Sequence, residues 1–201
     1  MIKIVAGEFR TRKLLVPADA SISRPYTHRA REAVFNLLRE WIEGASVLDL
    51  YAGVGSMGLE AVSRGAKSVL LVELDKGIFE LLEQNIEALG CGDRAVAMRA
   101  DAMGITALAR AARPVDVVFV DPPYEKMKDE TSRSRVLDLV ARCRAVMGEA
   151  GFVILRSPFG RDEADLEVAG FEGPEAHKYG KDMWVLLYAP KAGGDQARVT
   201  D

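Results

Sequence analysis

The segment of this chain best suited to chemistry is an acid, two prolines and an aromatic residue in succession: Asp121, Pro122, Pro123 and Tyr124. Because proline fixes φ and lacks an N–H, two in a row end the apolar run 115–120 abruptly. The Asp121 carboxylate and the Pro122 carbonyl could then accept from a planar amino group, and the Tyr124 ring offers a face for a base. Alternatively, the segment is a turn with a helix-capping acid and a surface tyrosine.

A glycine-rich turn follows another apolar run, 47–50. Gly53, Gly55 and Gly58 fit the pattern G-x-G-x-x-G, which allows a tight turn, a close ligand approach and close helix packing. Glu73 ends the next predicted strand, where an acid can bind the two hydroxyls of a ribose. A dinucleotide dehydrogenase would share these features.

Acids at the ends of three successive predicted strands favour a different cofactor. Asp49 precedes the glycine turn, where it could hold an ammonium group but would repel a pyrophosphate, and Asp101 could accept from an adenine amino group. Singly, each acid could equally be a cap or a solvated strand end. Their joint placement suits S-adenosylmethionine better than NAD. The expected cofactor contacts are Asp49, Tyr51, Ala52, Gly53, Gly55, Gly58, Glu73, Leu74, Asp101 and Ala102.

Composition agrees with one compact enzyme. The chain has 201 residues, 49% of them hydrophobic and 28% charged, enough for a single α/β domain with a small appendage. The sequence has neither a signal-peptide pattern nor an apolar run of membrane-spanning length, so we expect a cytoplasmic protein without a membrane partner. Cys91 and Cys143 form no CxxC and have no histidine cluster beside them, so we expect reduced thiols and no metal.

From residue 45 to 190, strand and helix patterns alternate, which predicts a mostly parallel, Rossmann-like sheet. Strands are expected near 46–51, 68–73, 95–99, 115–120 and 151–155, with helices near 57–65, 76–89, 104–112 and 133–147. Gly90 and Gly148 stand where helix C-caps would fall. The last two strands, near 170–174 and 183–188, have no helix between them and should form an antiparallel hairpin. This arrangement, with seven strands, looks like that of a class I S-adenosylmethionine-dependent methyltransferase. The tail 191–201 is expected to be disordered.

Residues 1–44 differ in charge from the rest of the chain. The first 31 residues contain seven basic and two acidic side chains, whereas the whole chain carries a net charge of −3. Ranges 2–5 and 13–16 could pair as a hairpin, and Thr27 could cap a following helix. A solvated basic surface is the simplest explanation, but clustering beside a presumed cleft favours phosphate contacts. The candidate RNA-binding residues are Arg10, Arg12, Lys13, Arg24, His28, Arg29 and Arg31.

Several stretches together resemble the RsmD family, over about residues 2–190. They are Ile4 to Leu14, Arg24 to Leu38, Leu48 to Ala61, the acids Glu73 and Asp101, Asp121 to Tyr124, and Lys178 to Gly180. The N-terminal Arg-Pro…Arg-Glu…Phe-Asn run is the most restrictive of these. Tyr26, Thr27 and His28 stand where the family usually has a Thr-Thr-Asp-like stretch.

The resemblance implies methyl transfer from S-adenosylmethionine to the exocyclic N2 of a guanine in small-subunit ribosomal RNA, with S-adenosylhomocysteine as the product. Asp121, Pro122, Pro123 and Tyr124 would be the catalytic residues, and a monomer would act on an assembling ribosomal particle. Three alternatives stay open: an adenine-N6 methyltransferase, a protein-glutamine methyltransferase, and a non-catalytic RNA-binding ribosome assembly factor.

Overall fold

The computed structural model describes residues 1–18 and 27–192. Its strands are β1 (Ile2–Lys3), β2 (Lys13–Leu14), β3 (Ser46–Leu50), β4 (Ser68–Glu73), β5 (Ala95–Arg99), β6 (Val115–Val120), β7 (Met147–Ser157), β8 (Phe171–Lys178) and β9 (Trp184–Pro190). Its helices are α1 (His28–Leu37), α2 (Arg39–Ile42), α3 (Gly58–Ser63), α4 (Lys76–Leu89), α5 (Ile105–Arg110), α6 (Tyr124–Lys128) and α7 (Glu130–Cys143).

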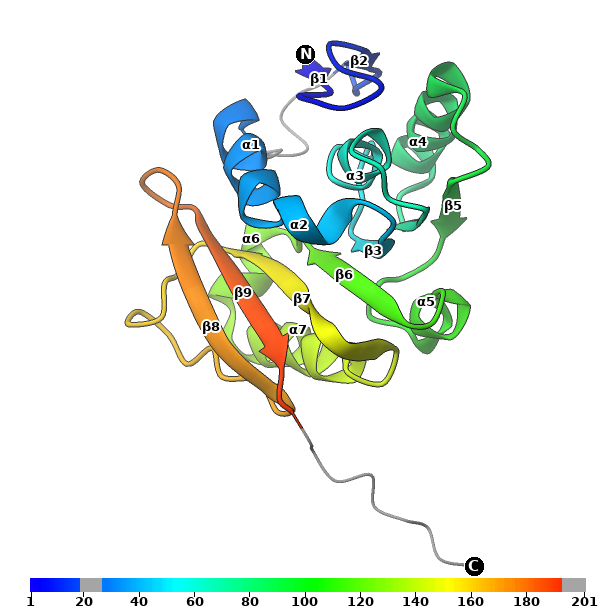
Figure 1. Ribbon diagram of the computed structural model, residues 1–201. Helices are drawn as coiled ribbons and strands as arrows, with labels where there is room; N and C mark the ends of the chain where they lie inside the picture. The colour runs from blue at the N-terminus through cyan, green and yellow to red at the C-terminus, as the bar shows by residue number, and fades with distance from the viewer. Residues whose placement is uncertain (19–26, 193–201) are drawn as a thin grey trace, which may run out of the picture.

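Seven strands form one sheet in the order β5-β4-β3-β6-β7-β9-β8 (Figure 1). Strands β3 to β7 run parallel, and β9 runs antiparallel to both of its neighbours, β7 and β8. The predicted α/β class is therefore confirmed, including the antiparallel hairpin at the end of the sheet.

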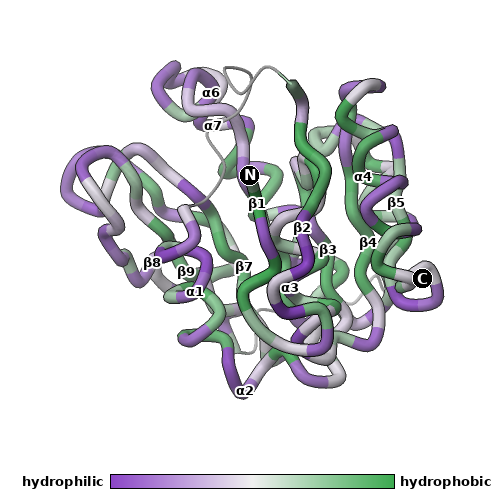
Figure 2. The backbone as a smooth tube through the Cα atoms, turned by 90° about the horizontal axis from the view of Figure 1, so that it is seen from above, coloured by the Kyte–Doolittle hydropathy of each residue, from purple (hydrophilic) through white to green (hydrophobic). Residues whose placement is uncertain are grey.

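Helices cover both faces of the sheet because alternate residues of each central strand point to opposite sides. On one face, Val47 and Phe119 belong to a buried cluster that also contains residues of α1 to α4. On the other face, Leu48 and Val118 share a second cluster with residues of α5 and α7. Hydrophobic stretches accordingly run through the middle of the molecule in Figure 2. The sheet is thus the central layer of three.

The predicted boundaries differ from the structure on either side of α7. This helix begins at Glu130, since the Asp129 side chain accepts from Ser132 N, and it ends at Cys143. The expected cap Gly148 lies inside β7, which starts four residues earlier than predicted and contains a register shift opposite β6. Gly90 does cap α4, with a φ of 68°.

The C-terminal hairpin is longer than predicted. Strand β8 continues to Lys178, and β9 continues to Pro190. Lys191, assigned to the tail, donates its backbone N–H to Gly170 O at 3.0 Å. The remainder of the predicted tail, 193–201, lies outside the described residues.

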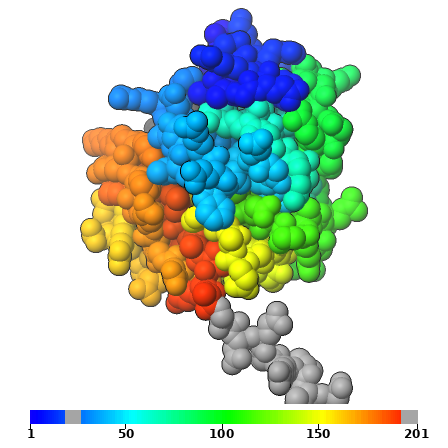
Figure 3. All heavy atoms as spheres, viewed as in Figure 1, coloured from blue at the N-terminus to red at the C-terminus, as the bar shows by residue number. Residues whose placement is uncertain are grey.

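The N-terminal segment packs onto the same core as the sheet. Strands β1 and β2 pair antiparallel, as predicted, but only over two residues each. Ile4, Phe9 and Leu14 belong to the cluster that contains residues of α3 and α4. Phe9, in the connection between the two strands, is buried because its apolar ring packs into that cluster. Figure 3 shows this segment as a cap over α3.

Glu60 on α3 is the polar anchor of that cap. Its fully buried carboxylate accepts from Val5 N at 2.7 Å and Ala6 N at 3.0 Å. It also pairs with Arg64 at 2.7 Å, and its Oε2 lies 3.8 Å from Arg31 Nε. A buried carboxylate needs such partners to offset its lost hydration. The N-terminal cap is therefore fixed through hydrogen bonds as well as apolar contacts.

Candidate active site

The parallel strands bring the predicted acids to a common edge. Asp49 is the fourth residue of β3, Glu73 ends β4, and Asp121 directly follows β6. Leu50 pairs with both Val72 and Val120, so these three strands finish side by side. Ligands of open α/β sheets bind at this carboxyl edge.

The three loop glycines have different local roles. Gly53 has a φ of +57°, donates its N–H to Glu73 Oε2 at 2.9 Å, and would have nothing within 4 Å of an added Cβ. An added Cβ at Gly55 would instead lie 2.7 Å from Leu82 Cδ1, and one at Gly58 2.6 Å from Leu71 Cδ2. Gly53 therefore faces open space, whereas the other two permit close packing.

Asp49 lies beneath this loop rather than in the open. Its side chain is 1% exposed, and its Oδ2 accepts from Gly58 N at 2.8 Å. Burial raises the pKa of Asp49 to about 8, a shift that the Gly58 hydrogen bond opposes and the nearby charges of Asp121 and Glu73 increase. Asp49 thus connects strand β3 to the start of α3 and retains a proton easily.

Glu73 organises the start of the neighbouring loop. Its Oε1 accepts from Leu74 N and Asp75 N, both at 2.8 Å, while its Oε2 holds Gly53. Leu74 itself is exposed. Carboxylate oxygens can accept further hydrogen bonds, so Glu73 remains suited to hydroxyl groups.

At the next strand end, Asp101 is exposed and its Oδ1 accepts from Met103 N at 2.9 Å. The adjacent Ala102 is buried against the core. Asp101 therefore lies exposed at the carboxyl edge of the sheet, where its side chain could accept a further hydrogen bond.

Tyr51 directly follows β3 and precedes the glycine loop, and its backbone geometry is unusual. It has a φ of +63°, a conformation that costs a residue with a side chain and that often marks functional sites. Its hydroxyl is buried without a hydrogen-bond partner among the described residues. Burial raises the pKa of Tyr51 to about 12, and Lys126 Nζ lies 5.3 Å from the ring centroid. A polar atom in this state is a candidate for contact with a ligand.

The acid-proline-proline-tyrosine segment forms a corner, as expected. Asp121 donates its N–H to Leu50 O at 3.3 Å, Pro122 is buried and Pro123 is exposed. Pro123 O accepts from Lys126 N at 2.9 Å, because a short helix, α6, begins at Tyr124. This helix was not predicted from the sequence, because its five residues are too few to show a helical periodicity of apolar positions.

Arg156 completes the corner, and sequence reasoning missed it. Its Nε lies 2.5 Å from Asp121 Oδ1, and its Cζ lies 5.1 Å from the centroid of the Tyr124 ring. It projects from β7, where Leu155 pairs with Val120, so it stands beside the end of β6. The available signal was a cation within a strand, since a buried charge implies a partner.

Burial and the guanidinium act in opposite directions on Asp121. Burial raises the pKa of Asp121 to about 6, and the charge and hydrogen bonding of Arg156 lower it. The carboxylate is consequently ionised at neutral pH but able to accept a proton at modest cost.

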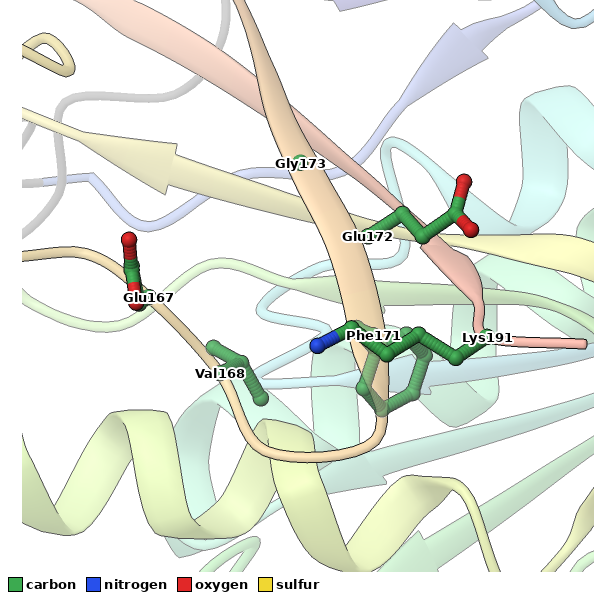
Figure 4. Close-up of a pocket in the computed structure, with 6 residues that line it drawn as sticks. All are labelled: Glu167, Val168, Phe171, Glu172, Gly173 and Lys191. Atoms are coloured by element: carbon green, nitrogen blue, oxygen red, sulfur yellow. The ribbon is translucent and has the colours of Figure 1, made fainter. Parts of the chain in front are cut away.

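A different hollow lies at the opposite end of the sheet. It is lined by residues of β8, of the preceding loop and of the position after β9 (Figure 4): Glu167, Val168, Phe171, Glu172, Gly173 and Lys191. Phe171 pairs with Pro190 at the end of antiparallel β9, so this hollow is remote from Asp121. Residues 1–18 and 27–192 contain no cluster of three metal-ligating side chains. Within the same ranges, every helix is too short or too polar to cross a membrane.

Comparison with known proteins decides the family. The family model described as "Conserved hypothetical protein 95", that of the RsmD family, matches residues 2–188. The chain belongs to the RsmD family.

Curated relatives in this family align with part of the chain. The Ribosomal RNA small subunit methyltransferase D of Escherichia coli K12 is 42% identical over 125 residues, which are 62% of this chain and 61% of that protein. The Haemophilus influenzae protein of the same name is 37% identical over 124 residues, 61% of this chain and 64% of its own length. The chain thus spans less than two thirds of these relatives in the alignments.

The similarity in fold covers more of the chain than these sequence alignments do. The solved structure of the Escherichia coli protein yhhF has a TM-score of 0.77 and 30% identity, covering 95% of this chain and 98% of that one. This RsmD-family chain therefore shares the architecture of that structure over nearly its whole length.

The predicted RNA-binding residues of this family member differ in their exposure and contacts. Arg10, Lys13, His28 and Arg29 are exposed, whereas Arg24 lies outside the described residues. Arg12 is exposed, and its Nη2 donates to Ala88 O.

Arg31 requires a correction. It is 2% exposed, pairs with Glu60 and donates to Lys3 O, so it holds the N-terminal cap and cannot reach RNA. The sequence-based expectation was wrong because a basic side chain was assumed to be at the surface.

Asn85 links the N-terminal segment to the glycine loop. Its Oδ1 accepts from Leu15 N at 2.7 Å, and its Nδ2 donates to Leu15 O at 3.1 Å and Val54 O at 3.0 Å. One buried amide thus joins the chain that follows β2 to the loop that contains Gly53 and Gly55.

Proposed function

We propose that this protein transfers a methyl group from S-adenosylmethionine to the exocyclic N2 of a guanine in small-subunit ribosomal RNA. The observation that carries the proposal is the corner of Asp121 and Tyr124 beside a loop of cofactor type, at one edge of the sheet. The names of the curated relatives support ribosomal RNA as the substrate. We further propose that a cytoplasmic monomer acts on an assembling small-subunit particle.

The residues present fit the proposed cofactor. Gly53 faces open space, and the buried Tyr51 hydroxyl has no hydrogen-bond partner in the described part of the chain. Glu73 would accept from the ribose hydroxyls, Asp101 from the adenine amino group, and Asp49 would attract the ammonium group. Ala52, Leu74 and Ala102 lie next to these residues and would contribute contacts.

When bound, S-adenosylmethionine supplies a methyl group whose bond to sulfur breaks as a bond to the amine nitrogen forms, leaving S-adenosylhomocysteine and one excess proton on that nitrogen. Asp121 accepts this proton and later releases it to water. Before transfer, the same carboxylate and the Pro122 carbonyl accept from the amine N–H groups and fix its orientation. Orientation matters because the guanine N2 lone pair is delocalised into the ring, and good alignment of two reactants lowers a barrier by roughly 7–11 kcal/mol.

Tyr124 provides the platform for the base. Its ring is partly buried at the start of α6, and stacking on such a ring contributes about 1–3 kcal/mol per base. A base must leave its neighbours to reach Asp121, and Tyr124 would compensate part of that cost. Pro123 keeps the ring close to the carboxylate by fixing the intervening backbone.

Exposed basic residues of the N-terminal cap and of the start of α1 would bind the RNA backbone. Arg10, Lys13, His28 and Arg29 are accessible, and phosphate contacts of this kind position a nucleic acid without reading its sequence. Arg12 and Arg24 extend this proposed set. The Asn85 bridge places the cap in contact with the cofactor loop, so RNA and cofactor would be held by adjoining segments.

Nucleoside mass spectrometry tests the proposal. Small-subunit particles from cells lacking this protein should gain N2-methylguanosine at one mapped site when incubated with the protein and S-adenosylmethionine. Heat-treated enzyme and particles from wild-type cells are the controls. Formation of N6-methyladenosine instead would transfer the activity to adenine. Tight cofactor binding without any methylated nucleoside would favour a non-catalytic assembly factor.

A further inference from the structure

We propose that Arg156 is a positioning residue for methyl transfer: its guanidinium keeps the Asp121 carboxylate ionised and correctly aimed, and it supports the Tyr124 ring from behind the base-binding face. This inference rests on the proposed function. It assigns one side chain to both halves of the corner, the acceptor and the stacking platform.

The first argument is the ion pair itself. Arg156 is 7% exposed, and the Asp121 side chain is 19% exposed, so water screens their attraction only weakly. The 2.5 Å separation between Nε and Oδ1 constrains the carboxylate more than solvent would.

The charges around Asp121 show why this cation matters. From β3, Asp49 lies nearby, and the charges of Asp121 and Glu73 both raise the pKa of Asp49. Glu73 at the end of β4 also adds negative charge to that edge. From α6, Lys126 lies over the Tyr51 ring. Arg156 on β7 is the cation in direct contact with the Asp121 carboxylate.

The second argument is the position of the guanidinium near Tyr124. A Cζ-to-centroid distance of 5.1 Å lies within the range for cation–π attraction. A guanidinium is planar and can face a ring while one of its nitrogens lies close to a carboxylate, whereas a lysine ammonium is a point charge. Arginine can therefore contact the Asp121 carboxylate and the Tyr124 ring at once, whereas lysine could contact only one of them at a time.

An NMR titration of Asp121 tests the proposal without substrate or cofactor. In protein labelled at the aspartate carboxyl carbon, the Asp121 signal is assigned by its loss in Asp121→Asn. The wild-type midpoint should lie near pH 6, because burial raises the pKa of Asp121 to about 6 against the opposing charge of Arg156. In Arg156→Gln the midpoint should rise by at least one pH unit, whereas Arg156→Lys should shift it less.

Arg133→Gln is the matched control. Arg133 also faces an aromatic ring, that of Phe159 at 5.6 Å, and its Nη1 donates to Met127 O on α6 at 3.1 Å. Its loss should leave the Asp121 midpoint unchanged. An unchanged midpoint in folded Arg156→Gln would overturn the proposal, and so would equal shifts in Arg156→Gln and Arg133→Gln. If Arg156→Gln does not fold, an Arg156→Lys midpoint equal to that of wild type, with unchanged kinetics for RNA, would overturn it.

Kinetics provide the second readout. The acid limb of the kcat profile should move upward with the Asp121 midpoint in Arg156→Gln. Arg156→Lys should keep most of kcat but raise KM for RNA about two- to fivefold, since it loses the planar contact with Tyr124. A failure of the proposed function would appear as an inactive wild type with the titration shifts intact, which separates the two hypotheses.

Discussion

The two halves of the carboxyl edge hold their acids by different means. Toward β4, Asp49 and Glu73 accept from backbone N–H groups of the loops that they organise. Toward β7, Asp121 is paired with a side-chain cation, Arg156. Backbone donors are neutral and fix a shape, whereas a guanidinium also sets the charge of its partner. In the proposed cofactor half, the acids therefore fix the shape of the loops. In the proposed substrate half, Arg156 controls the protonation of Asp121.

The strongest test of this difference is Asp121→Asn. Removing the proton acceptor while keeping the shape should reduce methyl transfer by about 10²–10⁴-fold. S-adenosylmethionine binding, measured by calorimetry, should change little because Asp121 belongs to the substrate half. Full turnover by this variant would contradict the assignment of Asp121.

Asp49→Asn probes the cofactor half. Because burial raises the pKa of Asp49 to about 8, this acid is mostly protonated at pH 7 in the free protein, and an arriving ammonium would lower its pKa and release the proton. Affinity should therefore rise as the pH approaches 8. The variant should bind S-adenosylmethionine roughly ten- to a hundredfold more weakly.

Calorimetry at pH 7 in two buffers with different protonation enthalpies measures that proton release. The binding heat of the wild type should depend on the buffer, and that of Asp49→Asn should not. A buffer-independent heat for the wild type would show that Asp49 does not exchange its proton with the cofactor site.

The N-terminal cap should contribute to RNA affinity through charge alone. Replacing both Arg10 and Lys13 with Gln should weaken binding to single-stranded RNA about tenfold at 0.15 M salt and make the salt dependence shallower by about 1.4 in log–log slope. Filter binding across a salt series measures both quantities. Arg110→Gln, at the end of α5, serves as the control, and an unchanged slope in the double variant would indicate a merely solvated surface.

The smallest effect is expected from Asn85→Ala, which separates the cap from the cofactor loop. Three hydrogen bonds are lost, and the backbone groups of Leu15 and Val54 lose their partner. The free energy of unfolding should fall by about 1–3 kcal/mol in urea titrations. Glu83→Gln, an exposed position on the same helix, should leave it within about 0.5 kcal/mol. Equal stabilities would mean that the bridge does not fix the cap.

Sequence patterns predicted most of the sheet because its central strands are short, mostly apolar runs. They predicted α7 less well, since its start depends on the cap at Asp129 and its end on the early beginning of β7. The periodicity of apolar residues does not show where a capping side chain starts a helix or where the next strand ends it.

Within the candidate site, positions at or near the carboxyl end of a strand were predictable, since parallel strands must finish together. Asp49, Glu73 and Asp121 are examples. The partner of Asp121 was not predictable, because the register that places Arg156 beside it is a tertiary property. Arg31 was misassigned for a related reason: the sequence does not show whether a charged side chain is buried or exposed.

The buried anchor Glu60 has a consequence for any truncation of this protein. A shortened chain starting at residue 45 would retain every strand of the large sheet but lose the Val5 and Ala6 donors and the Arg31 cation. The α3 carboxylate would then face an exposed apolar surface with Arg64 as its remaining neighbour among these partners. Such a fragment should aggregate or expand at its glycine loop, so the minimal unit for biochemical work includes the N-terminal cap.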